Sequence, residues 1–138
     1  MRLILATGGV LLGILTASAD EIRTSEGIVI HTDESRHALE ISGLAYAETA
    51  CHPFEFTGTI VERGFGSDEL IVTSVVIEAP NGTREVYKLN AIPSDLSMST
   101  TVWLYQGLQQ LTTTGRKAKG RAVACGTAGR SLVLDTIR

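Results

Sequence analysis

Alternating apolar and polar residues predict a series of β-strands in the second half of the chain. In residues 54–63, three apolar side chains and a glycine share one face, and polar side chains occupy the other. This period of two is expected of a strand with one buried face. Residues 69–79 are apolar on both faces and rich in β-branched side chains, which predicts a central strand. Pro80-Asn81-Gly82 then predicts a tight hairpin, because Asn-Gly accepts the positive φ angles of such turns, and residues 83–90 would form the returning strand.

A helix is predicted after Pro93, with Ser94, Asp95, Ser97 or Ser99 as its N-cap. Gly107 is expected to weaken this helix and Gly115 to end it. Two further strands are predicted at residues 117–125 and 130–137, joined by a glycine turn at 126–129. The positions at helical spacing, with Trp103 beside them, are Thr100, Leu104, Leu108 and Leu111.

From residue 54 onward the order is therefore strand, strand, strand, helix, strand, strand. This is the order of an OB-fold, a five-stranded barrel with a helix between its third and fourth strands. Gly58 suits the strong bend that the first barrel strand needs. Residues 27–32 are a short strand candidate and residues 38–47 a weaker one, both in an N-terminal extension, residues 20–53. The first residues of this extension, 20–27, are polar and expected to be loose. The fold class is thus mainly β with one helix, an OB-like barrel over residues 54–138. The alternative is a β-sandwich that uses the N-terminal strands as full members.

The first nineteen residues match a cleavable signal peptide. Arg2 supplies a positive charge, an apolar run extends from Leu3 to Leu15, and Thr16-Ala17-Ser18-Ala19 supplies the small residues of a cleavage site. The apolar run is shorter than the roughly 20 residues of a membrane-spanning helix, and it contains three glycines. We therefore expect export to a periplasmic or extracellular location, with cleavage near Ala19 and no transmembrane segment in the mature chain.

Two cysteines, Cys51 and Cys125, occur in the sequence. An even number of cysteines in an exported chain predicts one disulfide, which would close a long loop. A redox or nucleophilic cysteine is the alternative. It is disfavoured because the sequence has no Cys-x-x-Cys pair and because a catalytic thiol would leave the second cysteine unexplained.

Charge is distributed unevenly along the chain. Residues 20–69 carry eleven acidic and three basic residues, whereas residues 70–138 carry four acidic and eight basic residues. Within the basic half, Lys117, Lys119 and Arg121 are predicted to share one strand face, with Arg130 across the hairpin. These four residues are the candidate ligand-binding site for an anionic glycan, a lipid head group or nucleic acid. No aromatic residues alternate with these bases, which argues against single-stranded nucleic acid.

Two structural explanations of the same charges remain open. The acidic N-terminal segment could lie against the basic sheet and neutralise it within the fold. The basic row could instead be a solvated strand end that protects a sheet edge from aggregation.

The sequence contains none of the motifs that mark common catalytic or metal sites. His31, His37 and His52 are scattered without the spacing of metal ligands, so we assign no metal and no cofactor. There is no nucleophile elbow, no phosphate loop and no aspartate cluster of the kind found in secreted nucleases on OB barrels. We assign no catalytic residues, although paired carboxylates could still converge in space.

Short segments of the chain resemble the small periplasmic bacterial OB-fold proteins. The similar residues are 58–63 (GTIVER), 68–70 (DEL), 81–83 (NGT) and the closing strand 131–137. The resemblance implies an exported single domain that binds small or charged ligands, and it brings no catalytic residues. The resulting hypothesis is an exported, non-catalytic binding or interaction module for an anionic ligand or an envelope partner. The alternative is a small secreted hydrolase or a nuclease-like OB-fold enzyme.

Overall fold

One long, bent strand organises the sheet. In the computed structural model, which describes residues 20–67 and 69–138, strand β5 (His52–Phe65) pairs through its first half with β8 (Lys117–Cys125) and through its second half with β6 (Val72–Glu78). Thr59 belongs to both ladders. Beside it, a Cβ added at Gly58 would lie 2.5 Å from the carbonyl oxygen of Glu78. The bend therefore needs a residue without a side chain at this position, as the sequence predicts.

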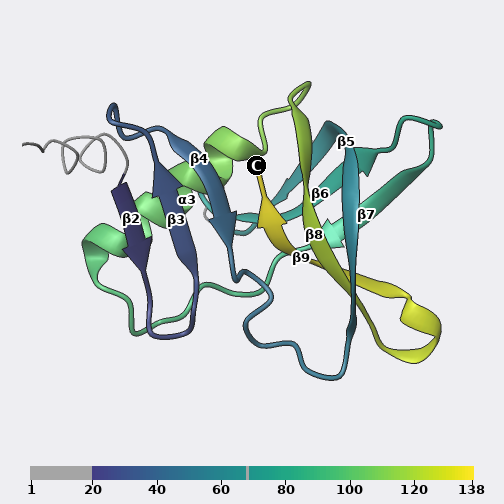
Figure 1. Cartoon of the computed structure of the whole chain (residues 1–138), viewed down its shortest axis with the longest axis horizontal. Coiled ribbons are helices and arrows are strands. Elements are labelled where there is room, and N and C mark those ends of the chain that lie inside the picture. Colours follow the sequence, from purple (N-terminus) through teal and green to yellow (C-terminus); the bar gives the residue numbers. More distant parts are fainter. Residues whose placement is uncertain (1–19, 68) are drawn as a thin grey trace, which may run out of the picture.

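Five strands close into a barrel, and three more extend its sheet (Figure 1). The order β9-β7-β6-β5-β8 is closed by pairing of β8 with β9. β4 then adds to β9 through Ile41 and Ile137, followed by β3 and β2. This confirms the prediction of a mainly β, OB-like barrel with one helix, rather than a β-sandwich. The remaining elements are β2 (Asp20–Arg23), β3 (Val29–Thr32), β4 (Ala38–Ser42), β7 (Arg84–Lys88), α3 (Met98–Leu111), η1 (Thr127–Gly129) and β9 (Ser131–Ile137).

Two local expectations need correction. Residues 20–27 are not all loose, because β2 pairs with β3 over four residues and Ile22 packs against the core. The hairpin after β6 forms as predicted, but only Gly82 in it has a positive φ, of 88°. The Gly82 N–H donates to the carbonyl of Ala79, so Pro80 and Asn81 occupy the centre of an ordinary β-turn and Gly82 follows it. Proline at the first central position favours this geometry because its φ is fixed near −65°. The signal-peptide prediction lies outside the described residues.

Helix α3 packs between the N-terminal strands and the barrel. Its N-cap is Ser97, whose hydroxyl accepts from the Thr100 N–H at 3.2 Å. The predicted stripe is buried at Leu104, Leu108 and Leu111. The helix crosses β4 closely at Gly107, where an added Cβ would be 3.0 Å from Ile41 Cδ1. One cluster of buried residues thus contains side chains from the extension, the helix and the barrel. Within the described residues, no helix is long and apolar enough to cross a membrane.

Candidate functional site

Three of the four predicted binding residues lie together on the outer face of β8. Lys117, Lys119 and Arg121 are exposed and alternate with buried residues along the strand. Across the ladder in β5, their partners are polar, with Thr59 opposite Lys117 and Glu55 opposite Arg121. The strand alternation therefore places three cations in a row, as the sequence predicts.

A fourth cation joins this row from the end of β9. The backbone groups of Arg138 and Lys119 exchange hydrogen bonds of 2.9 and 3.0 Å, so the two residues are direct cross-strand neighbours. The Arg138 guanidinium also pairs with Glu40 of β4 at 3.2 Å. We call Lys117, Lys119, Arg121 and Arg138 the β8 basic face. Sequence reasoning missed Arg138 because its position depends on the register between β8 and β9, which shifts at Arg121.

The fold leaves the β8 basic face only partly neutralised. Glu40 is the one acidic residue of the described chain that forms an ion pair with it. The other ion pairs found in the described part of the acidic half are internal to that half, as between Asp20 and Arg36 at 3.7 Å. Neutralisation of the basic sheet by the acidic N-terminal segment is therefore limited to the ion pair between Glu40 and Arg138.

Edge protection does not explain the row either. β8 is hydrogen-bonded on both sides, to β5 from residue 117 to 124 and to β9 from residue 120 to 125. A strand paired on both sides has no free backbone edge that a charge would need to guard. Lys119 and Arg121 are thus not accounted for by sheet protection, whereas Lys117 lies before the part of β8 that pairs with β9.

Arg130 lies away from this face. It precedes β9 in the turn beyond Cys125, and Cys125 pairs with Ser131, so the length of the hairpin separates Arg130 from Lys119. Arg130 lines a separate cleft of about 440 Å³ together with Arg84, Val86 and Leu132, among others. The four residues predicted from the sequence therefore do not line one concavity.

An aromatic cluster joins β5 to β7. Phe56 and Phe54 lie 5.2 and 6.4 Å from Tyr87, measured between ring centroids, and all three border a cleft of about 280 Å³. Burial raises the pKa of the Tyr87 hydroxyl above its ordinary value, and the nearby Glu85 carboxylate raises it further.

Two acidic residues, Glu55 and Glu85, also border this cleft. Both side chains are exposed, and none of the hydrogen bonds or ion pairs found among the described residues orients either carboxylate. Glu55 belongs to the face of β5 opposite Phe54 and Phe56, since successive side chains alternate. The cleft is thus bordered by two acids that lack the fixed geometry that acid–base catalysis requires.

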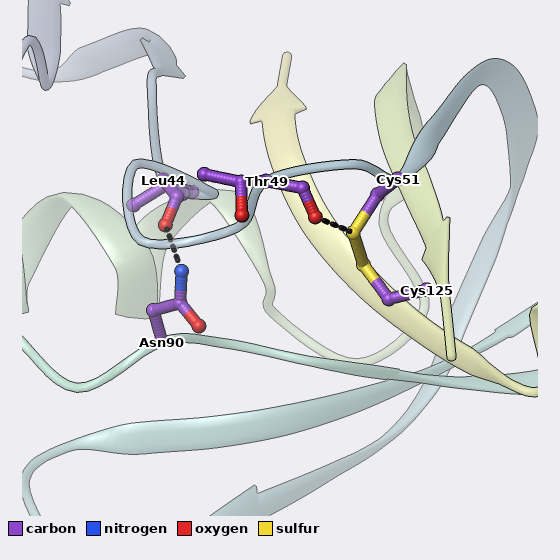
Figure 2. The surroundings of a disulfide bond; sticks show 5 residues. All are labelled: Leu44, Thr49, Cys51, Asn90 and Cys125. Atoms are coloured by element: carbon purple, nitrogen blue, oxygen red, sulfur yellow. Dashed lines mark hydrogen bonds between the residues drawn. A yellow bond between two sulfur atoms is a disulfide. The ribbon is translucent and has the colours of Figure 1, made fainter. Parts of the chain in front are cut away.

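The predicted disulfide joins Cys51 to Cys125, with a Cα–Cα distance of 4.7 Å (Figure 2). It connects the loop that leads into β5 with the end of β8. Polar contacts hold the same loop, including the Asn90 side-chain amide that donates to the Leu44 carbonyl at 3.2 Å and is drawn in Figure 2. An intramolecular disulfide indicates folding in an oxidising compartment.

The histidines lie on exposed or half-exposed positions. His31 lies between Glu21 and Glu40 on the β2–β4 strands, at 3.6 and 4.0 Å, and His37 lies 3.7 Å from Asp33. Among the described residues, one group of potential metal ligands is close enough to share an ion. It consists of Glu48 and the two cysteines, whose sulfur atoms are already bonded to each other.

Trp103 is half-buried against the core, and the Arg36 guanidinium lies 5.0 Å from the centre of its ring. The ring therefore packs on the N-terminal extension as well as on the barrel core. Comparisons with protein-family models, with curated proteins and with solved structures found no match to this chain.

Proposed function

We propose that this protein is an exported, non-catalytic binding module whose β8 basic face holds a polyanion. Export is supported by the signal-peptide pattern of residues 1–19 and by the disulfide, which belongs to an oxidising periplasmic or extracellular environment. The observation that carries the binding proposal is a group of four exposed cations, three on β8 and Arg138 at the end of β9, with one ion-pairing acid nearby.

The spacing of the row fits a ligand with repeated charges. Alternate residues on a strand are roughly 6.6 Å apart, so Lys117, Lys119 and Arg121 present positive charges at regular intervals along β8. The ligand chemistry is therefore a chain carrying sulfate, phosphate or carboxylate groups, such as an anionic envelope glycan. Thr57 and Thr59 of β5 flank the row with hydroxyl groups and offer no aromatic platform for nucleic acid bases.

The proposal is tested by measuring heparin binding as a function of salt. The double substitution Lys119→Gln and Arg121→Gln is compared with Arg23→Gln and Lys88→Gln, which remove the same charge from positions outside the face. We expect the first variant to lose about tenfold in affinity and to reduce the slope of log Kd against log salt, because two charge contacts are lost. The control is expected to change affinity by less than about twofold, since screened charges away from the site contribute little.

Two results would contradict the proposal. Equal losses in both variants would mean that heparin responds only to net charge and not to the β8 basic face. Hydrolysis of a polyanion by the purified protein, abolished by Glu55→Gln or Glu85→Gln, would overturn its non-catalytic character and favour the hydrolase alternative.

A further inference from the structure

The barrel is open between β7 and β9, away from the β8 basic face. In the described chain these two strands pair at one position, Lys88 with Val133, and run parallel there. Beyond it they diverge: the β6–β7 hairpin and the turn between β8 and β9 end at well-separated points (Figure 1). The cleft of about 440 Å³ lies in this wedge.

The β7 side of the wedge carries backbone groups without a partner strand. The Leu89 N–H donates to the Thr73 carbonyl of the neighbouring strand at 3.0 Å, which fixes the alternation of the β6–β7 ladder. Odd-numbered residues of β7 therefore bond to β6, and even-numbered residues direct their N–H and C=O groups to the other side. Arg84 and Val86 are the two even-numbered residues before the single β9 contact, so both face the cleft.

Side chains around the cleft suit a peptide rather than a bare anion. Val86 is 55% exposed, and Leu132, which also packs against the core, borders the cleft from β9, so each wall carries one apolar side chain. Arg84 and Arg130 are exposed at its borders. Arg84 pairs through Nε with Glu78 at 2.8 Å, whereas Arg130 forms no ion pair among the described residues. Glu85, the one acid of the lining, belongs to the other face of β7 with Tyr87.

We propose that this wedge binds an extended peptide segment of a partner protein by strand addition to β7, and that the segment carries an apolar residue and an acidic residue two positions apart, on the face that it shares with Val86 and Arg84. Its backbone pairs with Arg84 and Val86. On the face that these two residues share, an apolar side chain of the segment contacts Val86, and a carboxylate two positions away meets Arg84. Arg130, at the border of the cleft, offers a second cation to the acidic side of the segment. Strand addition supplies affinity from main-chain hydrogen bonds and specificity from alternate side chains. The proposal concerns a surface separate from the β8 basic face and stands independently of polyanion binding.

The test uses the acetylated and amidated hexapeptide Thr-Val-Thr-Glu-Thr-Thr, in which valine and glutamate share one face of the extended chain, titrated into ¹⁵N-labelled protein. We expect saturable shifts at the amides of Arg84, Val86 and Arg130. At saturation, hydrogen exchange at Val86 is expected to slow by about tenfold, because its N–H becomes paired. The same peptide N-methylated at every residue keeps its side chains but lacks the N–H donors, and we expect it not to bind.

Variants separate strand addition from charge attraction. Val86→Pro removes an N–H that points into the cleft and leaves the β6 pairing intact, so we expect it to lower peptide affinity by about tenfold. Val86→Thr keeps the N–H, and we expect its peptide affinity to stay within about twofold of the wild type. If Val86→Pro fails to fold, Arg130→Gln takes its place, because Arg130 lies in a turn outside the ladder. We expect Arg130→Gln to weaken peptide binding by about threefold or more. Lys119→Gln with Arg121→Gln should leave peptide binding unchanged.

Three results would overturn the proposal. The first is the absence of saturable shifts at peptide concentrations up to about 2 mM, because a weaker affinity would not indicate a specific contact. The second is equal binding of the N-methylated peptide, and the third is a set of shifts centred on Lys119 and Arg121. The last result would assign the peptide to the β8 basic face. Loss of heparin binding in the Lys119 and Arg121 variant, with peptide binding retained, would show that the two surfaces act separately.

Discussion

Removal of the disulfide is the perturbation whose effect can be worked most directly from the structure. Cys51 and Cys125 are 74 residues apart in the sequence, and the loop they close contains β5, β6, β7, α3 and β8. In the chain-entropy account, closing a loop of this length restricts the unfolded chain by about 4.4 kcal/mol at 25 °C. Because native contacts of the loop remain, we expect the Cys51→Ser and Cys125→Ser double variant to fold and to lose most of this amount.

Contacts independent of the disulfide hold the loop before Cys51 in place. The Asp135 carbonyl accepts from the Leu44 N–H at 3.0 Å, and the Asp135 carboxylate accepts from the Ala45 N–H at 3.2 Å. The Tyr46 hydroxyl donates to the Ala91 carbonyl at 2.6 Å. The folded state of the variant should therefore keep its geometry, and the loss of stability should arise mainly in the unfolded state.

Guanidinium chloride unfolding of the wild type and of the double variant measures this loss. We expect the free energy of unfolding to fall by about 3–4 kcal/mol and the midpoint of thermal unfolding by about 15 °C, since roughly 4 °C per kcal/mol suits a domain of this size. The m-value should rise in the variant, because an uncrosslinked unfolded chain exposes more surface. A loss below about 1 kcal/mol with an unchanged m-value would refute the entropic reasoning. Two free thiols in denatured, unreduced wild type would refute the disulfide itself.

Two further perturbations test the fold. Gly58→Ala places a Cβ 2.5 Å from the Glu78 carbonyl oxygen at the bend of β5. In urea unfolding we expect it to lower the free energy of unfolding by about 2 kcal/mol or more, against about 0.5 kcal/mol for the exposed Thr57→Ala. Equal effects of the two variants would show that the bend does not depend on Gly58. Because the pKa of Tyr87 is raised, the folded chain keeps a proton that the unfolded chain releases above about pH 10. The contribution of Tyr87 to the free energy of unfolding is therefore full below about pH 10 and is lost as the pH rises through the folded-state pKa. Unfolding measured from about pH 8 to 11.5 should show a steeper loss of stability in the wild type than in Tyr87→Phe, and parallel curves would contradict the assignment.

Period-two patterning predicted most of the strands because each exposes one face. β8 occupies the predicted residues 117–125, and β9 begins one residue later than predicted, at Ser131. β6 begins at Val72 instead of residue 69, since Glu69 has a positive φ of 60° and belongs to the turn before it. β2 was missed because its one apolar residue, Ile22, gives no pattern, and its strand geometry comes from pairing with β3, a contact between segments that local propensity does not encode.

Some features of the candidate sites follow from local sequence, and others depend on contacts between distant segments. The shared face of Lys117, Lys119 and Arg121 follows from the strand period alone. Arg138, to which the sequence reasoning gave no role, joins the row because the ladder between β8 and β9 shifts register and leaves Asp135 as an extra residue on β9. Arg130 lies away from the row because it belongs to the turn before β9. The free edge of β7 depends on where β9 leaves it, so no local pattern of residues 84–88 could have indicated the cleft.

The order of charges across the sheet constrains how a polyanion would lie on it. From β2 toward β8, neighbouring strands present Glu21, His31, Glu40, Arg138 and Lys119 in turn, each in contact with or directly opposite the next. A polyanion that lay across the strands would contact the cations of β8 and β9 at one end, and at the other end it would contact the carboxylates of β4 and β2. Along β8, by contrast, it would meet Lys117, Lys119 and Arg121 in succession, with Glu55 opposite Arg121 as the acid beside this path. Because like charges repel as strongly as opposite charges attract at equal distance, the ligand axis should follow β8, and polyanion affinity should rise when Glu40 is neutralised by Glu40→Gln.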